Sequence, residues 1–172
     1  LSAGQVGFDL AKVTERSRKV ANQLNSGVKS LMKKNKVTVV EGVATLASAT
    51  VVKVGERTLE AKNVIVATGA RARELPHLKA DGERVWTYRH AMVPPAMPTE
   101  LLVIGSGAIG VEFASFFNDM GAKVTIVEML DRILPVEDEE ISAFMDKALK
   151  KQGMTIRTKA AVEKLDVKAD GV

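Results

Sequence analysis

The sequence contains no cysteine, and its aromatic residues are few, with one tryptophan, one tyrosine and five phenylalanines among 172 residues. Without cysteine the chain can form no disulfide and offers no thiolate to a metal or a redox reaction, and we expect an intracellular, cytoplasmic protein. No run of about 20 apolar residues occurs, so no transmembrane helix is expected. The two histidines lie far from any acidic cluster with ligand spacing, which leaves no metal site to propose.

The chain begins with Leu1-Ser2-Ala3, without an initiator methionine or a signal-peptide pattern, and we expect it to be an internal piece of a longer protein. Its net charge of +4 is unevenly distributed. Residues 1–98 carry 16 basic and 8 acidic side chains, whereas residues 99–172 carry 9 and 13. This asymmetry favours two partial domains, 1–98 and 99–172.

The stretch 101–128 has the organisation of a dinucleotide-binding unit. Residues 101–104 are apolar, as expected for a parallel strand that is buried on both faces. Three glycines with G-x-G-x-x-G spacing follow, at Gly105, Gly107 and Gly110. In this motif the first glycine permits a tight turn, the second lets a pyrophosphate approach the backbone, and the third lets helix and strand pack closely. A helix is predicted to begin near Ala108, with its free N–H groups toward the phosphates.

This helix is predicted to end at Gly121. Its expected buried stripe consists of Ile109, Phe113, Phe116 and Met120. A second strand follows at 123–127 and ends in Glu128, 23 residues after Gly105. The glycine motif alone is a weak signal, but strand, helix and acid in this order indicate dinucleotide binding. Glu128 favours NAD over NADP, because a carboxylate accepts hydrogen bonds from the ribose 2′-hydroxyl and repels a 2′-phosphate.

Beyond Glu128 the alternation of helix and strand continues. Four acidic residues at 137–140 mark the first turn of a helix, and their interaction with its dipole explains them better than a metal site does. The helix is predicted to end at Gly153. Its expected apolar face consists of Ile141, Phe144, Met145, Ala148 and Leu149. With strands expected at 154–158 and 160–167, residues 99–172 are predicted to form part of a Rossmann-like parallel sheet.

The first half of the chain predicts a long helix followed by an antiparallel β-meander. The helix is expected over residues 9–35, with Asp9 as its N-cap. Its apolar face consists of Val13, Val20, Leu24, Val28 and Leu31. Its numerous cations predict a solvated face rather than a nucleic-acid site, because no aromatic residues alternate with them.

The meander is predicted over residues 37–67, with a first strand at 37–41 and a last, buried strand at 64–67. For Thr68-Gly69, which follows, an ordinary turn and a close approach to a bound cofactor are equally compatible with the pattern. Residues 71–98 hold four of the five prolines and are interpreted as a linker.

Four segments of the sequence, residues 31–42, 64–70, 102–113 and 133–141, resemble the flavoprotein disulfide reductases, and among them the dihydrolipoamide dehydrogenase family most closely. The resemblance extends over essentially the whole chain, and it implies an α/β fold with FAD and NAD as cofactors. The implied FAD contacts are Gly42, Thr68, Gly69 and Ala70. The implied NAD contacts are Gly105, Ser106, Gly107, Ala108, Ile109, Gly110, Val111, Glu112, Glu128 and Val162. Within this set, the resemblance places Glu112 near the nicotinamide, Glu128 at the adenosine ribose and Val162 at the adenine.

The resemblance also implies that the redox-active cysteine pair and the His–Glu acid/base pair lie outside these residues. No catalytic residue is therefore expected in this chain, and the piece alone is expected to be inactive. The parent protein is expected to be a homodimer that docks on the E2 acyltransferase of a 2-oxo acid dehydrogenase complex and reduces NAD⁺ with dihydrolipoamide. Neither nucleic acid nor membrane is an expected partner. The alternatives are a related reductase or transhydrogenase that uses NADP, and a non-catalytic NAD-binding redox sensor.

Overall fold

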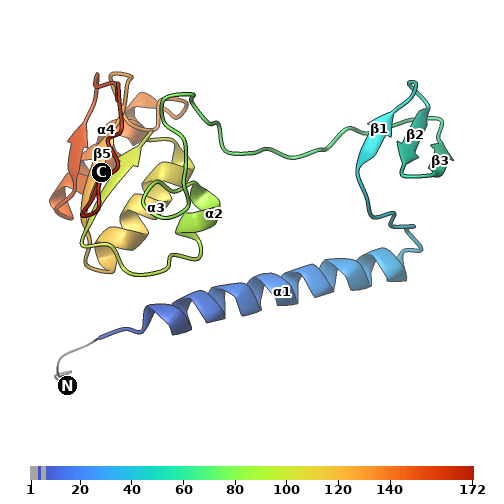
Figure 1. Ribbon diagram of the computed structural model, residues 1–172, viewed down its shortest axis with the longest axis horizontal. Helices are drawn as coiled ribbons and strands as arrows, with labels where there is room; N and C mark the ends of the chain where they lie inside the picture. The colour runs from blue at the N-terminus through green and yellow to red at the C-terminus, as the bar shows by residue number, and fades with distance from the viewer. Residues whose placement is uncertain (1–3, 5–6) are drawn as a thin grey trace. The chain divides into compact units, whose positions relative to one another are not determined.

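The computed structural model describes residue 4 and residues 7–172, and its architecture is α/β with one antiparallel and one parallel sheet (Figure 1). The chain divides into two compact units, unit 1 up to Arg71 and unit 2 from Ala72 to Val172. Unit 1 holds α1 (Leu10–Lys34), β1 (Ala44–Leu46), β2 (Val51–Val54) and β3 (Arg57–Glu60). Unit 2 holds α2 (Tyr88–Ala91), β4 (Glu100–Ile104), α3 (Ala108–Asp119), β5 (Lys123–Val127), α4 (Glu139–Lys151) and β6 (Thr155–Arg157).

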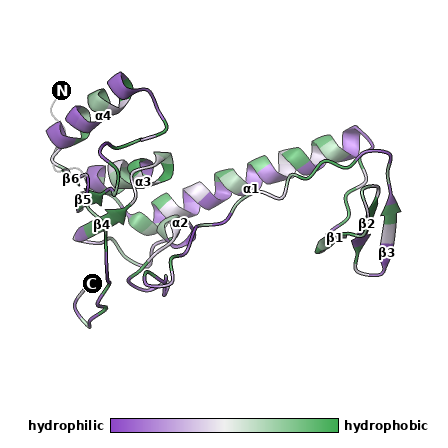
Figure 2. Cartoon of the chain, turned by 90° about the horizontal axis from the view of Figure 1, so that it is seen from above, coloured by the Kyte–Doolittle hydropathy of each residue, from purple (hydrophilic) through white to green (hydrophobic). Residues whose placement is uncertain are grey.

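Helix α1 confirms the predicted long helix and its N-cap. The Asp9 carboxylate accepts a hydrogen bond of 3.2 Å from the Lys12 N–H, which satisfies one of the free amides of the first turn. Hydrophobic and hydrophilic residues alternate along the helix (Figure 2). The apolar face is uncovered, with Leu24 67% exposed, and none of the described residues of α1 is buried.

The antiparallel meander is shorter than predicted. Strand β2 pairs with both β1 and β3, and Gly55, at φ +56°, supplies the left-handed residue in the two-residue turn between β2 and β3. The expected strands at 37–41 and 64–67 are wrong, because both segments lack strand structure and Ile65 is 90% exposed. Both are rich in β-branched residues, but a strand also needs a neighbour to pair with, and neither segment has a paired strand beside it among the described residues.

Unit 2 contains a parallel sheet of order β4-β5-β6, so the predicted β-α-β-α-β unit is confirmed. Ile104 and Val127 are partners in the register, and the carboxyl ends of β4 and β5 therefore lie side by side. The prediction that β4 is covered on both faces is wrong, because Leu102 and Ile104 are 49% and 44% exposed. The residues that alternate with them, Leu101 and Val103, pack against the core on the other face.

The core of unit 2 lies between the sheet and α3. Its fully buried side chains include Phe117 of α3, Ile126 of β5 and Ile133 of the following connection. The prediction that Ile109 and Phe116 are buried on α3 is wrong, because their side chains are 59% and 37% exposed. The buried residues of α3 are Val111, Ala114 and Phe117. Successive residues of a helix are about 100° apart, so residues one or two positions away from the buried ones lie on a different face of α3.

Helix α4 confirms the predicted helix, but only Glu139 and Glu140 of the acidic run lie in its first turn, because the helix begins at Glu139. Asp138 is its N-cap, and the Asp138 carboxylate accepts a hydrogen bond of 2.8 Å from the Glu140 N–H. Its buried residues are Ser142 and Leu149, whereas Phe144, expected on the apolar face, is 71% exposed. Strand β6 follows as predicted, but the strand expected at 160–167 is absent from this described segment.

The two compact units meet between Arg71 and Ala72. The division into partial domains at 98 and 99, which the charge pattern favours, stays a prediction. The segment interpreted as a linker, 71–98, supplies side chains to the core of unit 2. Trp86 packs against Phe117, with ring centroids 6.2 Å apart, and its indole N–H donates to the Glu83 carbonyl. The prolines correctly indicated a segment with little regular structure. The segment is nevertheless part of unit 2, because the apolar Trp86 side chain packs against the core of that unit.

Candidate functional site

The glycine turn connects the carboxyl end of β4 to α3. Gly105 follows Ile104 directly and has φ +95°, a conformation that residues other than glycine rarely adopt. Its N–H donates to the Val127 carbonyl at 2.9 Å, which ties the turn to the end of β5. The sequence prediction of a tight turn at this position is confirmed.

The other two glycines of the motif differ in what surrounds them. A Cβ at Gly110 would lie 2.2 Å from the Gly105 carbonyl oxygen, so this glycine is required by the contact between helix and turn. A Cβ at Gly107 would meet no heavy atom within 4 Å among the described parts of the chain, and its φ of −65° is open to any residue. A positive φ explains Gly105 and a close contact explains Gly110, whereas neither applies to Gly107, whose outer side is open. That opening fits a ligand that approaches the backbone.

The amino end of α3 points its free amides toward this opening. Gly107 is the N-cap of α3 without a side-chain cap, and the first hydrogen bond of the helix runs from the Val111 N–H to the Gly107 carbonyl. The three preceding amides, those of Ala108, Ile109 and Gly110, therefore lie at the positive end of the helix dipole. Such an end stabilises an anionic group such as a pyrophosphate.

Glu128 lies directly after β5 and is 8% exposed. Its Oε2 accepts two hydrogen bonds from Ser106, one from the N–H at 2.9 Å and one from the hydroxyl at 2.6 Å. Its Oε1 accepts a third, from the Leu130 N–H at 2.8 Å. The acid and the glycine turn, 22 residues apart in the sequence, are thus joined directly.

These contacts determine the charge of Glu128. Burial by itself would raise the pKa of the carboxyl group, but the hydrogen bonds from Leu130 and Ser106 outweigh it and hold the pKa of Glu128 below its ordinary value. The group is therefore a carboxylate at neutral pH, as an acceptor of ribose hydroxyls needs to be.

The remaining residues predicted to contact NAD are distributed around this turn. Ser106 is fully buried and faces Glu128, whereas Ala108, Ile109 and Glu112 are exposed on α3. The buried Val111 belongs to the core beneath the turn. Val162 is half-buried, and the nearby Ala160 N–H donates to the Glu128 carbonyl at 2.9 Å, so this segment passes the same end of the sheet.

The residues predicted to contact FAD lie in unit 1. Gly42 has φ +145°, and a Cβ there would lie 2.6 Å from a methyl carbon of Val54, so the local fold already requires this glycine. Thr68, Gly69 and Ala70 are exposed and have no regular secondary structure. Gly69 has φ +73°, which fits a turn, and an FAD contact at these residues remains a prediction.

Three residues of the hydrogen-bonded series that ends at Glu128 were missed by the sequence analysis, namely Leu130, Leu134 and Ser142. Leu130 contributes only its backbone amide, which no sequence pattern announces. Ser142 could have been found, because helical spacing places it on the same face of α4 as the buried Leu149, and a polar side chain on a buried face needs a partner. Its hydroxyl donates to the Leu134 carbonyl at 3.0 Å.

The described residues contain neither a cluster of metal-ligand side chains nor a helix suited to cross a membrane. No set of three or more His, Asp or Glu side chains there is placed to hold a metal ion. None of the described helices combines the length and the apolar character that a membrane crossing demands.

Comparison with known proteins identifies relatives over the whole chain. Dihydrolipoyl dehydrogenase of Zymomonas mobilis is 52% identical over all of this chain and 38% of that protein. Dihydrolipoyl dehydrogenase of Rhizobium etli is 44% identical over 98% of this chain and 39% of that protein. The chain therefore spans less than half the length of these relatives.

Solved structures agree with this result. The crystal structure of LpdA from Mycobacterium tuberculosis matches 94% of this chain and 38% of that chain, with a TM-score of 0.81 and 27% identity. The flavoprotein disulfide reductase RclA from Escherichia coli, in its Cu(II) complex, matches 91% and 37%, with a TM-score of 0.77 and 28% identity. The family described as pyridine nucleotide-disulphide oxidoreductase matches residues 3–172. The chain belongs to the pyridine nucleotide-disulphide oxidoreductase family.

Proposed function

We propose that this chain is the part of an FAD-dependent dihydrolipoamide:NAD⁺ oxidoreductase that binds NAD and contributes to the FAD site. The observation that carries the proposal is the arrangement of an open glycine, Gly107, beside an ionised and buried acid, Glu128. The two groups lie at the carboxyl ends of adjacent parallel strands, which is where open α/β sheets bind ligands. The similarity to dihydrolipoyl dehydrogenases supports the choice of reaction.

In this proposal the chain binds and orients, and the cofactors carry the electrons. FAD and NAD, when bound, supply the acceptance and transfer of a hydride. The amides at the start of α3 would hold the NAD pyrophosphate beside Gly107. Glu128 would accept a hydrogen bond from the adenosine ribose through Oε1, because Oε2 is engaged twice by Ser106. Gly42, Thr68, Gly69 and Ala70 would line the FAD.

The proposal extends to the whole protein in its partners. We infer a homodimer that docks on the E2 acyltransferase of a 2-oxo acid dehydrogenase complex, with the dithiol chemistry supplied outside these residues, since the chain has no cysteine. Oxidation of dihydrolipoamide by NAD⁺ in the whole protein tests this part. A whole protein that holds FAD but lacks this activity would contradict it.

The nucleotide site is tested by titration calorimetry with NAD⁺ and NADP⁺. Substitution Glu128→Gln keeps the shape of the side chain but removes its charge. We expect NAD⁺ affinity to fall by roughly 1.5–3 kcal/mol, the value of a charge-assisted hydrogen bond. The control is Glu100→Gln, which changes an exposed acid at the amino end of β4 and should leave the affinity unchanged. Unchanged NAD⁺ binding in Glu128→Gln, or tighter binding of NADP⁺ than of NAD⁺ by the unmodified protein, would refute the assignment.

A further inference from the structure

Leu134 has an unusual backbone in the connection between β5 and α4, residues 128–138. Its φ is +47°, in the left-handed region that residues other than glycine seldom occupy, and it precedes Pro135. It is 8% exposed. Strained residues of this kind persist only where the surrounding structure holds them, and they concentrate at binding and active sites.

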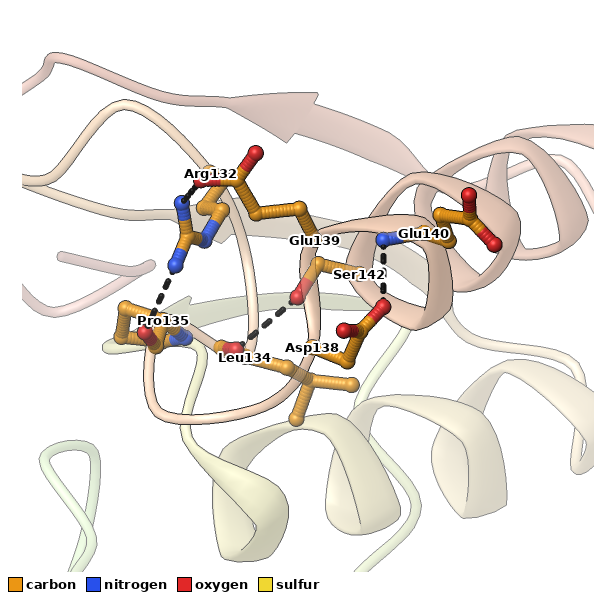
Figure 3. A network of polar contacts seen from close by, with 7 residues as sticks. All are labelled: Arg132, Leu134, Pro135, Asp138, Glu139, Glu140 and Ser142. Carbon is orange, nitrogen blue, oxygen red and sulfur yellow. Dashed lines mark hydrogen bonds and ion pairs between the residues drawn. The ribbon is translucent and has the colours of Figure 1, made fainter.

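Two serines hold this residue through its own backbone. The Leu134 N–H donates to the Ser106 carbonyl at 3.0 Å. The Leu134 carbonyl accepts from the Ser142 hydroxyl at 3.0 Å (Figure 3). Ser142 is 1% exposed and lies in the first turn of α4. Its hydroxyl therefore links the start of α4 to the left-handed residue.

On the exposed side of the same connection, Arg132 forms an ion pair and a hydrogen bond. The Arg132 guanidinium pairs with the Glu139 carboxylate at 2.7 Å and donates to the Pro135 carbonyl at 3.3 Å (Figure 3). Asp138 caps α4 immediately beyond. The connection is thus attached to α4 from two sides, through Ser142 inside and through Arg132 at the surface.

On its buried side the connection is linked to Glu128 by hydrogen bonds through Ser106. Ser106 accepts from Leu134 with its carbonyl and donates to Glu128 with both its N–H and its hydroxyl. Ser142, Leu134, Ser106 and Glu128 therefore form one continuous series of hydrogen bonds between buried groups. A displacement of Leu134 would displace the Ser106 carbonyl, and with it the two donors that orient Glu128.

We propose that Ser142 is a positioning residue for the dinucleotide: it holds Leu134 in its left-handed conformation and so fixes Ser106 and the Glu128 carboxylate in the orientation that binds the ribose. The inference rests on the proposed binding of NAD⁺. It assigns a role to the 133–141 segment, which the family resemblance singled out but which contributes no predicted NAD contact.

The direct test is NAD⁺ titration of the Ser142→Ala variant in the intact protein. We expect the dissociation constant to rise roughly three- to tenfold, the effect of one lost hydrogen bond. The matched control is Ser30→Ala, which also removes a hydroxyl donating to a carbonyl at 3.0 Å, but within the exposed part of α1. That variant should bind as the unmodified protein does. Unchanged binding by Ser142→Ala would overturn the inference.

A double-mutant cycle distinguishes positioning from a general structural effect. If Ser142 acts through Glu128, Ser142→Ala should weaken NAD⁺ binding further by less than about twofold once Glu128→Gln is present. If the two losses multiply in full, Ser142 acts by another route and the inference fails.

Hydrogen exchange provides a readout that needs no nucleotide. Ser142→Ala should speed exchange at the amides of both Leu134 and Ser106, and faster exchange at Leu134 alone would overturn the coupling. This measurement separates the positioning role of Ser142 from the proposed binding of NAD⁺, because it remains informative if the unmodified protein fails to bind NAD⁺. If Ser142→Ala does not fold, the unmodified protein is used, and NAD⁺ should then slow exchange at Leu134 together with Ser106. Slower exchange at Ser106 alone would count against the proposal.

Discussion

Ser106 donates two hydrogen bonds to a single oxygen of Glu128, from its N–H at 2.9 Å and from its hydroxyl at 2.6 Å. Both residues are buried, and they belong to the two turns that leave the carboxyl ends of β4 and β5. The glycine turn and the acid are therefore parts of one hydrogen-bonded unit. Ser106, between the first two glycines, gives Glu128 a hydroxyl donor that glycine or alanine at this position would lack.

The pair makes stability depend on pH. The pKa of Glu128 is lower in the folded protein than in the unfolded chain, so its contribution is present above the unfolded pKa and is lost as the pH falls through the folded value. Ser106→Ala removes the hydroxyl and should reduce the free energy of unfolding at pH 7 by roughly 1.5–3 kcal/mol. The deficit should begin to shrink as the pH falls below the unfolded pKa, about 4.3, and should vanish below the lowered folded pKa, where the carboxyl group is protonated in both states. Urea unfolding at several pH values measures it.

The control for this experiment is Ser30→Ala, whose hydroxyl bonds a neutral carbonyl on exposed α1. Its effect on unfolding should be small and independent of pH. A deficit in Ser106→Ala that persisted after the folded Glu128 carboxyl group is protonated would show that the hydroxyl does not act through the Glu128 charge.

The two glycines at the start of α3 should respond differently to alanine. Gly110→Ala places a Cβ 2.2 Å from the Gly105 carbonyl and should cost about 1–3 kcal/mol of stability through overpacking. Gly107→Ala meets no described atom within 4 Å and should cost less than about 1 kcal/mol, the scale of an N-cap preference. If Gly107 faces the pyrophosphate, its variant should nevertheless lose NAD⁺ affinity. Thermal unfolding and calorimetry on both variants check the contrast, and normal NAD⁺ binding by Gly107→Ala would place the phosphate elsewhere.

Phe117 is the centre of the core beneath the site. It is 0% exposed and contacts the rings of Trp86, Phe113 and Phe116. Phe117→Ala should lower the free energy of unfolding by about 3–5 kcal/mol, because it removes buried apolar surface and leaves a cavity. The Trp86 fluorescence should report the change, since the two rings are in contact.

Phe144→Ala is the matched substitution at a position that is 71% exposed. It should change stability by no more than about 0.5 kcal/mol. Equal losses at Phe117 and Phe144 would mean that the apolar face of α4 is covered in the protein under test.

Local patterns in the sequence predicted the elements of the nucleotide-binding unit well. The glycine spacing identified the turn and the start of α3, the apolar runs identified β4 and β5, and the acidic run identified the start of α4. Each of these signals depends on a few consecutive residues, such as a glycine needed for a positive φ at Gly105 or acidic side chains in the first turn of α4. The same kind of signal failed at 37–41, 64–67 and 160–167, where β-branched or apolar residues occur without a paired neighbour.

By itself, the sequence determined the order of strands and helices around residues 101–157 and the position of the acid after β5. The tertiary structure decided which faces are buried, because that depends on the rotation of α3 and α4 against the sheet. It also decided what Glu128 contacts beyond its own turn, since Ser106 bonds Glu128, and Leu134 bonds Ser106, only when two turns are brought together. Hydrogen bonds between segments more than 20 residues apart leave no periodic trace in a sequence. Together with the local bond from Leu130, these bonds orient the acid and lower its pKa.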